Sequence, residues 1–102
     1  MKSKKMLFFN KVVRFFKKQL PYRFAVRRCK TKNGFEGDCT YNYETDDYVI
    51  RISNKLSENK AVGVFLHEAS HLGSLLKQDD PHGTAFGIAY SKIYKMWEAE
   101  FT

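Results

Sequence analysis

Two histidines four positions apart, with a glutamate beside the first, are the residues of this chain best suited to chemistry. The segment His67-Glu68-Ala69-Ser70-His71 would place both imidazoles on one face of an α-helix, because about 3.6 residues make a turn. Two nitrogen ligands and a carboxylate on one rigid element are typical of zinc peptidases. A shuffled chain of this composition would contain the pattern roughly 0.005 times. The alternative is an ordinary helix whose histidines are only packed.

A third ligand is needed, because catalytic zinc usually takes three protein ligands and keeps a fourth position for water. His82 is the remaining histidine. We expect it in the first turn of a final helix, four residues before Phe86 and on the same inward face, where it would lean over the motif helix. The competing ligands are carboxylates: Asp79, Asp80 and Glu98. We expect Asp79 and Asp80 to be caps or partners of the ligands instead.

The predicted reaction is hydrolysis of a peptide bond in a protein substrate, with one catalytic Zn²⁺. Zinc lowers the pKa of its bound water toward about 7. Glu68 would take the proton of that water and deliver it to the leaving amine. Tyr90 and Tyr94 are candidate donors to the oxyanion; aromatic core is the alternative interpretation of both.

These residues must be positioned by an α+β fold. Residues 4–20 have the pattern of a basic amphipathic helix that Pro21 ends. Its inward residues would be Met6, Phe9, Val13, Phe16 and Leu20. Residues 22–53 would form a three-stranded antiparallel sheet, with strands at 22–30, 39–44 and 48–53 and a hairpin turn at Asn33-Gly34. In the last strand Tyr48, Ile50 and Ile52 share a face. If that strand is the sheet edge, an extended peptide could pair with it.

Two helices complete the predicted fold. Ser57 is a plausible N-cap for the motif helix, residues 57–77, whose buried stripe would be Val62, Phe65, Ala69, Leu72 and Leu76. Gly63 lies one turn before His67, where either room for a substrate or close helix packing would explain a glycine. Asp80-Pro81 would begin the C-terminal helix, residues 80–101, whose inward stripe would be Phe86, Ala89, Ile93 and Trp97.

Composition indicates one folded domain of 102 residues, with 43% hydrophobic residues. No apolar run is long enough to span a bilayer. Asn10 and Lys11 interrupt the short apolar stretch near the start, so we expect no signal peptide and a cytoplasmic protein. A membrane-surface role for the helix at 4–20 is an alternative, although core packing explains its apolar stripe more simply. We interpret Cys29 and Cys39 as free structural thiols, which the Asn33-Gly34 hairpin would bring nearly opposite each other.

Basic residues are concentrated at the start of the chain. Residues 1–32 hold 12 Lys or Arg and no acid, whereas residues 33–102 hold 6 basic and 11 acidic residues, which gives the net charge of +7. This asymmetry indicates a polyanionic partner, with nucleic acid the first candidate; a solvated basic face is the alternative. The candidate contacts are Lys11, Arg14, Lys17, Lys18, Arg27, Arg28, Lys30 and Lys32.

With its HExxH motif and a downstream histidine-glycine segment, His82-Gly83-Thr84-Ala85-Phe86-Gly87-Ile88-Ala89-Tyr90, the chain resembles the SprT-like zinc metallopeptidases, especially the short versions encoded by bacterial viruses. The resemblance covers residues 57–97 well and the strand region only by the order of its elements. It implies a minimal zincin-like fold, His67, His71 and His82 as zinc ligands, Glu68 as the catalytic residue, and the cytoplasm of a host cell.

The resemblance also bears on partners. Relatives such as Spartan cleave proteins crosslinked to DNA and depend on DNA binding, which suits the basic first third. This chain lacks the cysteine-rich zinc ribbon that many relatives carry, so any DNA contact must come from the core or from residues 2–32. The alternative hypothesis is a non-catalytic, basic nucleic-acid-binding protein that retains a zincin fold around a structural metal. Glu68 argues against it, since a structural site needs no base.

Overall fold

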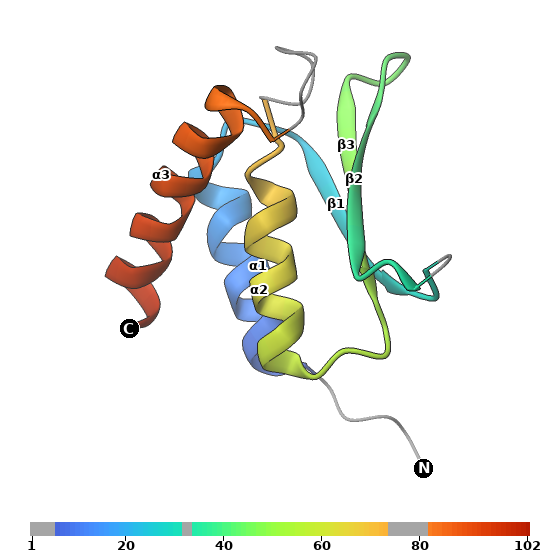
Figure 1. The fold of residues 1–102 in the computed structure, drawn as a ribbon, viewed down its shortest axis with the longest axis vertical. Coiled ribbons are helices and arrows are strands. Elements are labelled where there is room, and N and C mark those ends of the chain that lie inside the picture. The colour runs from blue at the N-terminus through green and yellow to red at the C-terminus, as the bar shows by residue number, and fades with distance from the viewer. Residues whose placement is uncertain (1–5, 32–33, 74–81) are drawn as a thin grey trace.

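The computed structural model describes residues 6–31, 34–73 and 82–102, and it is an α+β fold (Figure 1). Its elements, in chain order, are α1 (Leu7–Gln19), β1 (Phe24–Cys29), β2 (Gly37–Asn42), β3 (Asp47–Ser53), α2 (Glu58–Ala69) and α3 (Thr84–Phe101). Figure 1 shows the helices on one side of the sheet, with α2 in front of α1. None of the helices in the described ranges is both long and apolar enough to cross a membrane.

The sheet is mixed, so the prediction of an antiparallel sheet is wrong. The strand order is β1-β3-β2; β1 runs parallel to β3, and β2 runs antiparallel to it. β3 takes the centre because it is the most apolar strand, with Ile50 and Ile52 fully buried. The predicted placement of β3 at the sheet edge is therefore wrong as well.

The predicted hairpin at Asn33-Gly34 is also wrong, because β3 separates β1 from β2; Asn33 itself lies outside the described residues. The hairpin of this fold joins β2 to β3 through residues 43–46, where Asp46 adopts a left-handed conformation with φ 56°. The two cysteines consequently do not face each other. Cys29 pairs with Ser53 and Cys39 with Ile50, and both are free thiols.

The core lies between the helices and one face of the sheet. Phe65 of α2 is fully buried, and its ring centroid lies 6.1 Å from that of Phe9 and 5.9 Å from that of Phe16. The predicted inward stripe of α1 is thus confirmed, with Val12 as a buried residue that the pattern missed. Tyr48, Ile50 and Ile52 share the buried face of β3, as predicted.

The boundaries of the helices decide where the histidines stand. The Ser57 side chain accepts a hydrogen bond from the Lys60 amide, so the predicted N-cap of α2 is confirmed. The helix ends at Ala69 rather than at 77. Gly73 then takes φ 78°, and a Cβ there would overlap the Tyr22 ring, so only glycine fits this turn. Leu76 lies outside the described residues.

The last helix begins later than predicted. It starts at Thr84 with Gly83 as its N-cap, so His82 lies before the helix and not in its first turn. Asp80 and Pro81 lie outside the described residues. Of the predicted inward stripe of α3, Phe86 and Ile93 are buried, whereas Ala89 and Trp97 are half-buried.

The two edges of the sheet differ in their surroundings. At β1, the Lys17 ammonium of α1 donates a hydrogen bond to the Phe24 carbonyl, which points away from β3. At β2, Ser53 N donates a hydrogen bond to Glu36 O, so Glu36 and every second residue after it direct their N–H and C=O groups toward β3. The N–H and C=O groups of Gly37, Cys39 and Tyr41 therefore point outward. We call β1 the guarded edge and β2 the open edge.

Candidate metal centre

Three histidines from separate parts of the fold converge at the end of α2. His67, His71 and His82 each offer a ring nitrogen, and these nitrogens all lie within 4.8 Å of one another. The Nε2 atoms of His67 and His82 are 3.3 Å apart. Two nitrogens bound to one zinc ion at about 2.05 Å in tetrahedral geometry would be about 3.3 Å apart. The three imidazoles could therefore hold a metal ion, and the His67–His82 distance is the one expected around zinc.

Each histidine is held by a different local element. His67 lies in the last turn of α2. His71 lies in the turn after the helix, where its amide donates to the Glu68 carbonyl at 3.0 Å. His82 stands two residues before α3. The i, i+4 spacing thus brings His67 and His71 together, with ring centroids 5.4 Å apart, although the second histidine is no longer in the helix.

Phe86 forms the apolar support of this cluster. Its ring centroid lies 4.6 Å from that of His71 and 5.0 Å from those of His67 and His82. The sequence pattern assigned Phe86 only to the core. Its position four residues after His82 was the available signal that the ring also orients the imidazoles.

The electrostatic state of the imidazoles suits metal binding. Burial lowers the pKa of His67, and burial together with the neighbouring histidines lowers the pKa of His71 to about 4. Both rings are therefore neutral near pH 7, which is the form that binds metals. The Nδ1 atom of His71 is buried and has no hydrogen-bond partner among the described residues. A buried polar atom without a partner needs an explanation, and a metal ion bound by the imidazoles would be one.

Glu68 stands between the histidine cluster and the open edge. Its side chain is 7% exposed, and a Cβ built on Gly37 of β2 would lie 3.6 Å from Glu68 Cγ. Burial, with a smaller contribution from the Asp38 charge, raises the pKa of Glu68 to about 7. Burial also raises the pKa of Cys39 to about 12, helped by the charges of Glu68 and Asp38.

A groove of about 690 Å³ opens beside these residues. His67 and Glu68 line it together with Gly63 of α2, with residues 34–37 leading into β2, and with Tyr90 of α3. A Cβ added at Gly63 would meet nothing within 4 Å. Close helix packing therefore does not explain this glycine, and room for a substrate stays a prediction.

Of the two candidate oxyanion donors, only Tyr90 is placed beside the site. Its ring centroid lies 6.3 Å from that of His67, and it lines the groove. The Tyr94 ring is tilted by 42° to that of Tyr90, with centroids 5.8 Å apart, and Tyr94 does not line the groove. The side chains are 37% and 42% exposed, so the interpretation of both as aromatic core is wrong.

Of the carboxylate alternatives for the third ligand, only Glu98 is among the described residues, and it does not join the cluster. Within the described residues, the group that could hold a metal consists of the three histidines alone. Glu98 is exposed near the far end of α3. Asp79 and Asp80 lie outside the described residues.

The basic residues of the first third divide into two groups. Lys17 and Arg28 have structural contacts: Lys17 with Phe24, and Arg28 with the sulfur of Met6 and with the carbonyl oxygens of Ser53 and Leu56. The other exposed candidates are Lys11, Arg14, Lys18, Arg27 and Lys30, and Lys17 is itself exposed. Lys32 lies outside the described residues.

The exposed cations of α1 lie far from the histidines. Lys11, Arg14 and Lys18 share the helix face opposite to Phe16, which packs on Phe65. His67 lies on the face of α2 opposite to Phe65. The thickness of two packed helices therefore separates the basic stripe, defined as Lys11, Arg14 and Lys18, from the metal cluster by roughly 20 Å.

Comparisons with protein-family models, with curated proteins and with solved structures find no match to this chain.

Proposed function

We propose that this protein is a zinc-dependent endopeptidase of the SprT-like, zincin type. One observation carries the proposal: Glu68 is buried beside a cluster of three imidazoles, and the cluster opens into a groove. Structural zinc sites are almost always closed by four protein ligands. Three ligands, an adjacent carboxylate and an accessible groove instead fit a site at which a substrate reacts.

The division of labour follows from the residue types. His67, His71 and His82 would hold the zinc ion, which when bound supplies a Lewis acid for the peptide carbonyl and acidifies a water. Glu68 accepts the proton of the attacking water and returns it to the departing amine. Tyr90 is the candidate donor to the developing oxyanion, because its side chain lines the groove that contains His67 and Glu68.

The open edge is the proposed binding site for the substrate backbone. Gly37, Cys39 and Tyr41 direct their N–H and C=O groups outward, and no side chain of the described residues forms a hydrogen bond with these groups. An extended peptide would satisfy them by adding a strand to β2. Because Gly37 lies against Glu68, a peptide in this position would pass directly beside the catalytic carboxylate.

The test is cleavage of an unfolded model protein by purified protein loaded with zinc. We expect wild-type cleavage, and a loss of about 10²–10⁴-fold in turnover for Glu68→Gln with one zinc ion still bound, measured by elemental analysis. Glu98→Gln, an exposed glutamate far from the cluster, is the matched control. Loss of zinc from Glu68→Gln would instead make Glu68 a ligand, and undiminished turnover would remove its proposed role.

A nucleic-acid partner has a separate observation in its favour. The basic stripe on α1 is exposed and has no acid beside it on the helix, because α1 contains no acidic residue. It faces away from the groove, so a polyanion bound there would leave the metal cluster accessible. We therefore propose that DNA, if bound, contacts α1 and serves to bring the peptidase to DNA-associated proteins.

The same stripe supports the alternative function, a non-catalytic nucleic-acid-binding protein with a structural metal. Affinity for single-stranded DNA should fall with salt and should weaken when Lys11, Arg14 and Lys18 are all changed to Ala. Cleavage by the wild type that depends on DNA would join both functions. DNA binding without any cleavage, with zinc bound, would favour the alternative.

A further inference from the structure

The groove beside the histidines has an exposed aromatic residue on its sheet side. Phe35 precedes β2, lines the groove and is 60% exposed. An exposed phenylalanine forgoes the stabilisation that burial of its side chain would give. Its exposure is thus a cost to the isolated fold that contact with another molecule would recover.

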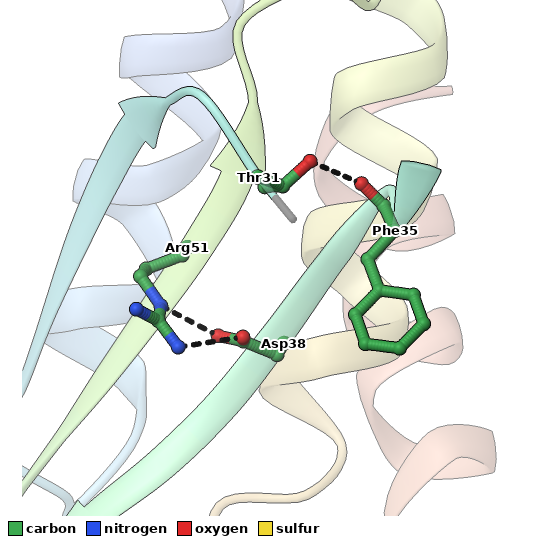
Figure 2. A network of polar contacts seen from close by, with 4 residues as sticks. All are labelled: Thr31, Phe35, Asp38 and Arg51. Atoms are coloured by element: carbon green, nitrogen blue, oxygen red, sulfur yellow. Dashed lines mark hydrogen bonds and ion pairs between the residues drawn. The ribbon is translucent and has the colours of Figure 1, made fainter. Parts of the chain in front are cut away.

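The backbone at Phe35 and at the residue after it is held by hydrogen bonds. The Thr31 hydroxyl donates a hydrogen bond to the Phe35 carbonyl (Figure 2). The next residue, Glu36, accepts a bond from Ser53 N at 2.8 Å and forms an ion pair with Lys60 of α2 at 3.3 Å. Figure 2 shows the ring of Phe35 projecting from the start of β2, away from Thr31. A held backbone with an exposed ring is typical of a preorganised contact.

A second aromatic residue lines the same groove from the helical side. Tyr90 stacks on Phe86, with ring planes at 10° and centroids 5.8 Å apart, so its ring is supported from behind. The floor between the two aromatic residues includes Gly63, where a Cβ would meet nothing within 4 Å, and Val64. The groove therefore offers two aromatic surfaces and an open floor next to His67.

We propose that Phe35 and Tyr90 select substrates, and that the groove takes an extended peptide with a large apolar side chain, aromatic or long aliphatic, beside the bond to be cut. The inference rests on the proposed function and names its substrate class. The occupant is an extended peptide because only an unpaired backbone matches the outward N–H and C=O groups of the adjoining open edge. Its side chain is apolar because the rings of Phe35 and Tyr90 and the side chain of Val64 line the groove. The charged residues Glu36 and Lys60 also line it, but they form an ion pair with each other.

The test measures peptide binding and not cleavage, so it stays separate from the proposed activity. The probes are four capped peptides, Ala-Ala-Ser-X-Ser-Ala-Ala with X as Phe, Leu, Ala or Asp, titrated into the zinc-loaded Glu68→Gln protein. We expect the Phe peptide to bind about tenfold more tightly than the Ala peptide. Phe35→Ala should remove most of that preference and leave the affinity for the Ala peptide unchanged.

Matched variants separate the proposed contact from general effects. Tyr43→Ala removes an aromatic side chain that is 76% exposed and does not line the groove, and it should leave the preference intact. Phe35→Trp should keep the preference, and Tyr90→Phe should keep it while losing the phenol that the oxyanion role requires. Thermal unfolding of each variant shows whether it is folded.

Each result decides the inference. Equal affinity for the four peptides, no measurable binding of any of them, or an equal loss in Phe35→Ala and Tyr43→Ala would overturn it. If selectivity is present but the wild-type protein cleaves none of the peptides, the groove assignment stands and the peptidase proposal fails. Cleavage of all four peptides at equal kcat/KM would support the peptidase and refute the selectivity.

Discussion

The guarded edge and the open edge belong to the same small sheet, but only one of them is available to a new strand. At β1 the Lys17 ammonium binds the Phe24 carbonyl and lies 4.8 Å from the centre of the Phe24 ring. A cation at an edge strand discourages pairing with another chain. At β2 no such cation is present among the described residues, and Gly37 brings the strand against α2 beside Glu68.

The domain thus protects one edge of its sheet and leaves the other edge free. An unprotected edge is an aggregation hazard, so it is expected where function requires it. The open edge adjoins the buried carboxylate of Glu68, and its Gly37 lines the same groove as His67. The guarded edge adjoins α1, and two of the predicted nucleic-acid contacts, Lys17 of α1 and Arg28 of β1, form hydrogen bonds within the fold there.

The largest predicted effect is on zinc affinity, which should depend on the histidine ligands and not on the cations near the guarded edge. His82→Ala should weaken zinc binding by about 100-fold or more, because it removes one of three ligands. Arg27→Ala, an exposed residue of β1, is the control and should leave the zinc affinity unchanged. Competition with a fluorescent chelator measures both affinities. Equal zinc affinity in His82→Ala and the wild type would exclude His82 as a ligand.

Two glycines beside the open edge should respond in opposite directions. A Cβ at Gly37 would lie 2.7 Å from Val64 Cγ1 and 2.8 Å from the Arg51 carbonyl oxygen, so Gly37→Ala should lower the free energy of unfolding by about 1–3 kcal/mol. The Cβ that Gly63→Ala adds would lie in open space. This variant should raise the free energy of unfolding by about 0.5–1 kcal/mol, because alanine favours the helix.

Gly63→Ala should nevertheless lower kcat/KM, since the added methyl group narrows the groove beside His67. Urea denaturation and peptide cleavage measure the two properties on the same sample. A variant that is more stable and equally active would refute the interpretation of Gly63 as room for the substrate.

The thiol of the open edge should be unreactive. Burial and the nearby carboxylates raise the pKa of Cys39 to about 12, so little thiolate is present at pH 8. In the Cys29→Ala protein, the remaining thiol should react with iodoacetamide at least about tenfold more slowly than an unstructured cysteine peptide. Mass spectrometry follows the alkylation. Reaction at the peptide's rate would contradict the burial of Cys39 beneath this edge.

The smallest predicted effect concerns Lys17, the cation at the guarded edge. Lys17→Met keeps the apolar stem but removes the donor to the Phe24 carbonyl. It should lower the free energy of unfolding by about 1 kcal/mol and increase self-association at high concentration, measured by light scattering. Lys18→Met is the matched control, because Lys18 is exposed on the neighbouring position of α1. Equal behaviour of both variants would mean that Lys17 does not guard the edge.

Local patterns predicted the parts of the site that depend on local spacing. The i, i+4 histidines, the Ser57 cap and the inward stripe of α1 follow from helical geometry. The position of His82 was inferred from its distance to Phe86; the two rings do lie 5.0 Å apart, although the helix begins only at Thr84. The prediction that His82 lies near the other two histidines is confirmed, whereas its predicted place in the first turn of the helix is wrong.

The strand order could not be read from the sequence in the same way. Asn33-Gly34 has the composition of a hairpin turn, but the choice of partner for β1 depends on burial of Ile50 and Ile52 at the centre of the sheet. That choice is a long-range packing effect, and turn residues do not report it. For the same reason the sequence did not predict the roles of Gly37 and Phe35, which depend on the packing of β2 against α2.

Residue-resolved amide hydrogen exchange can show whether the open edge receives the substrate. The zinc-loaded Glu68→Gln protein would be measured with and without an excess of the Phe-containing peptide. We expect slower exchange of the Gly37, Cys39 and Tyr41 amides and no change at Val26 on the guarded edge. Unchanged exchange along β2, or protection at Val26 instead, would contradict binding at the open edge.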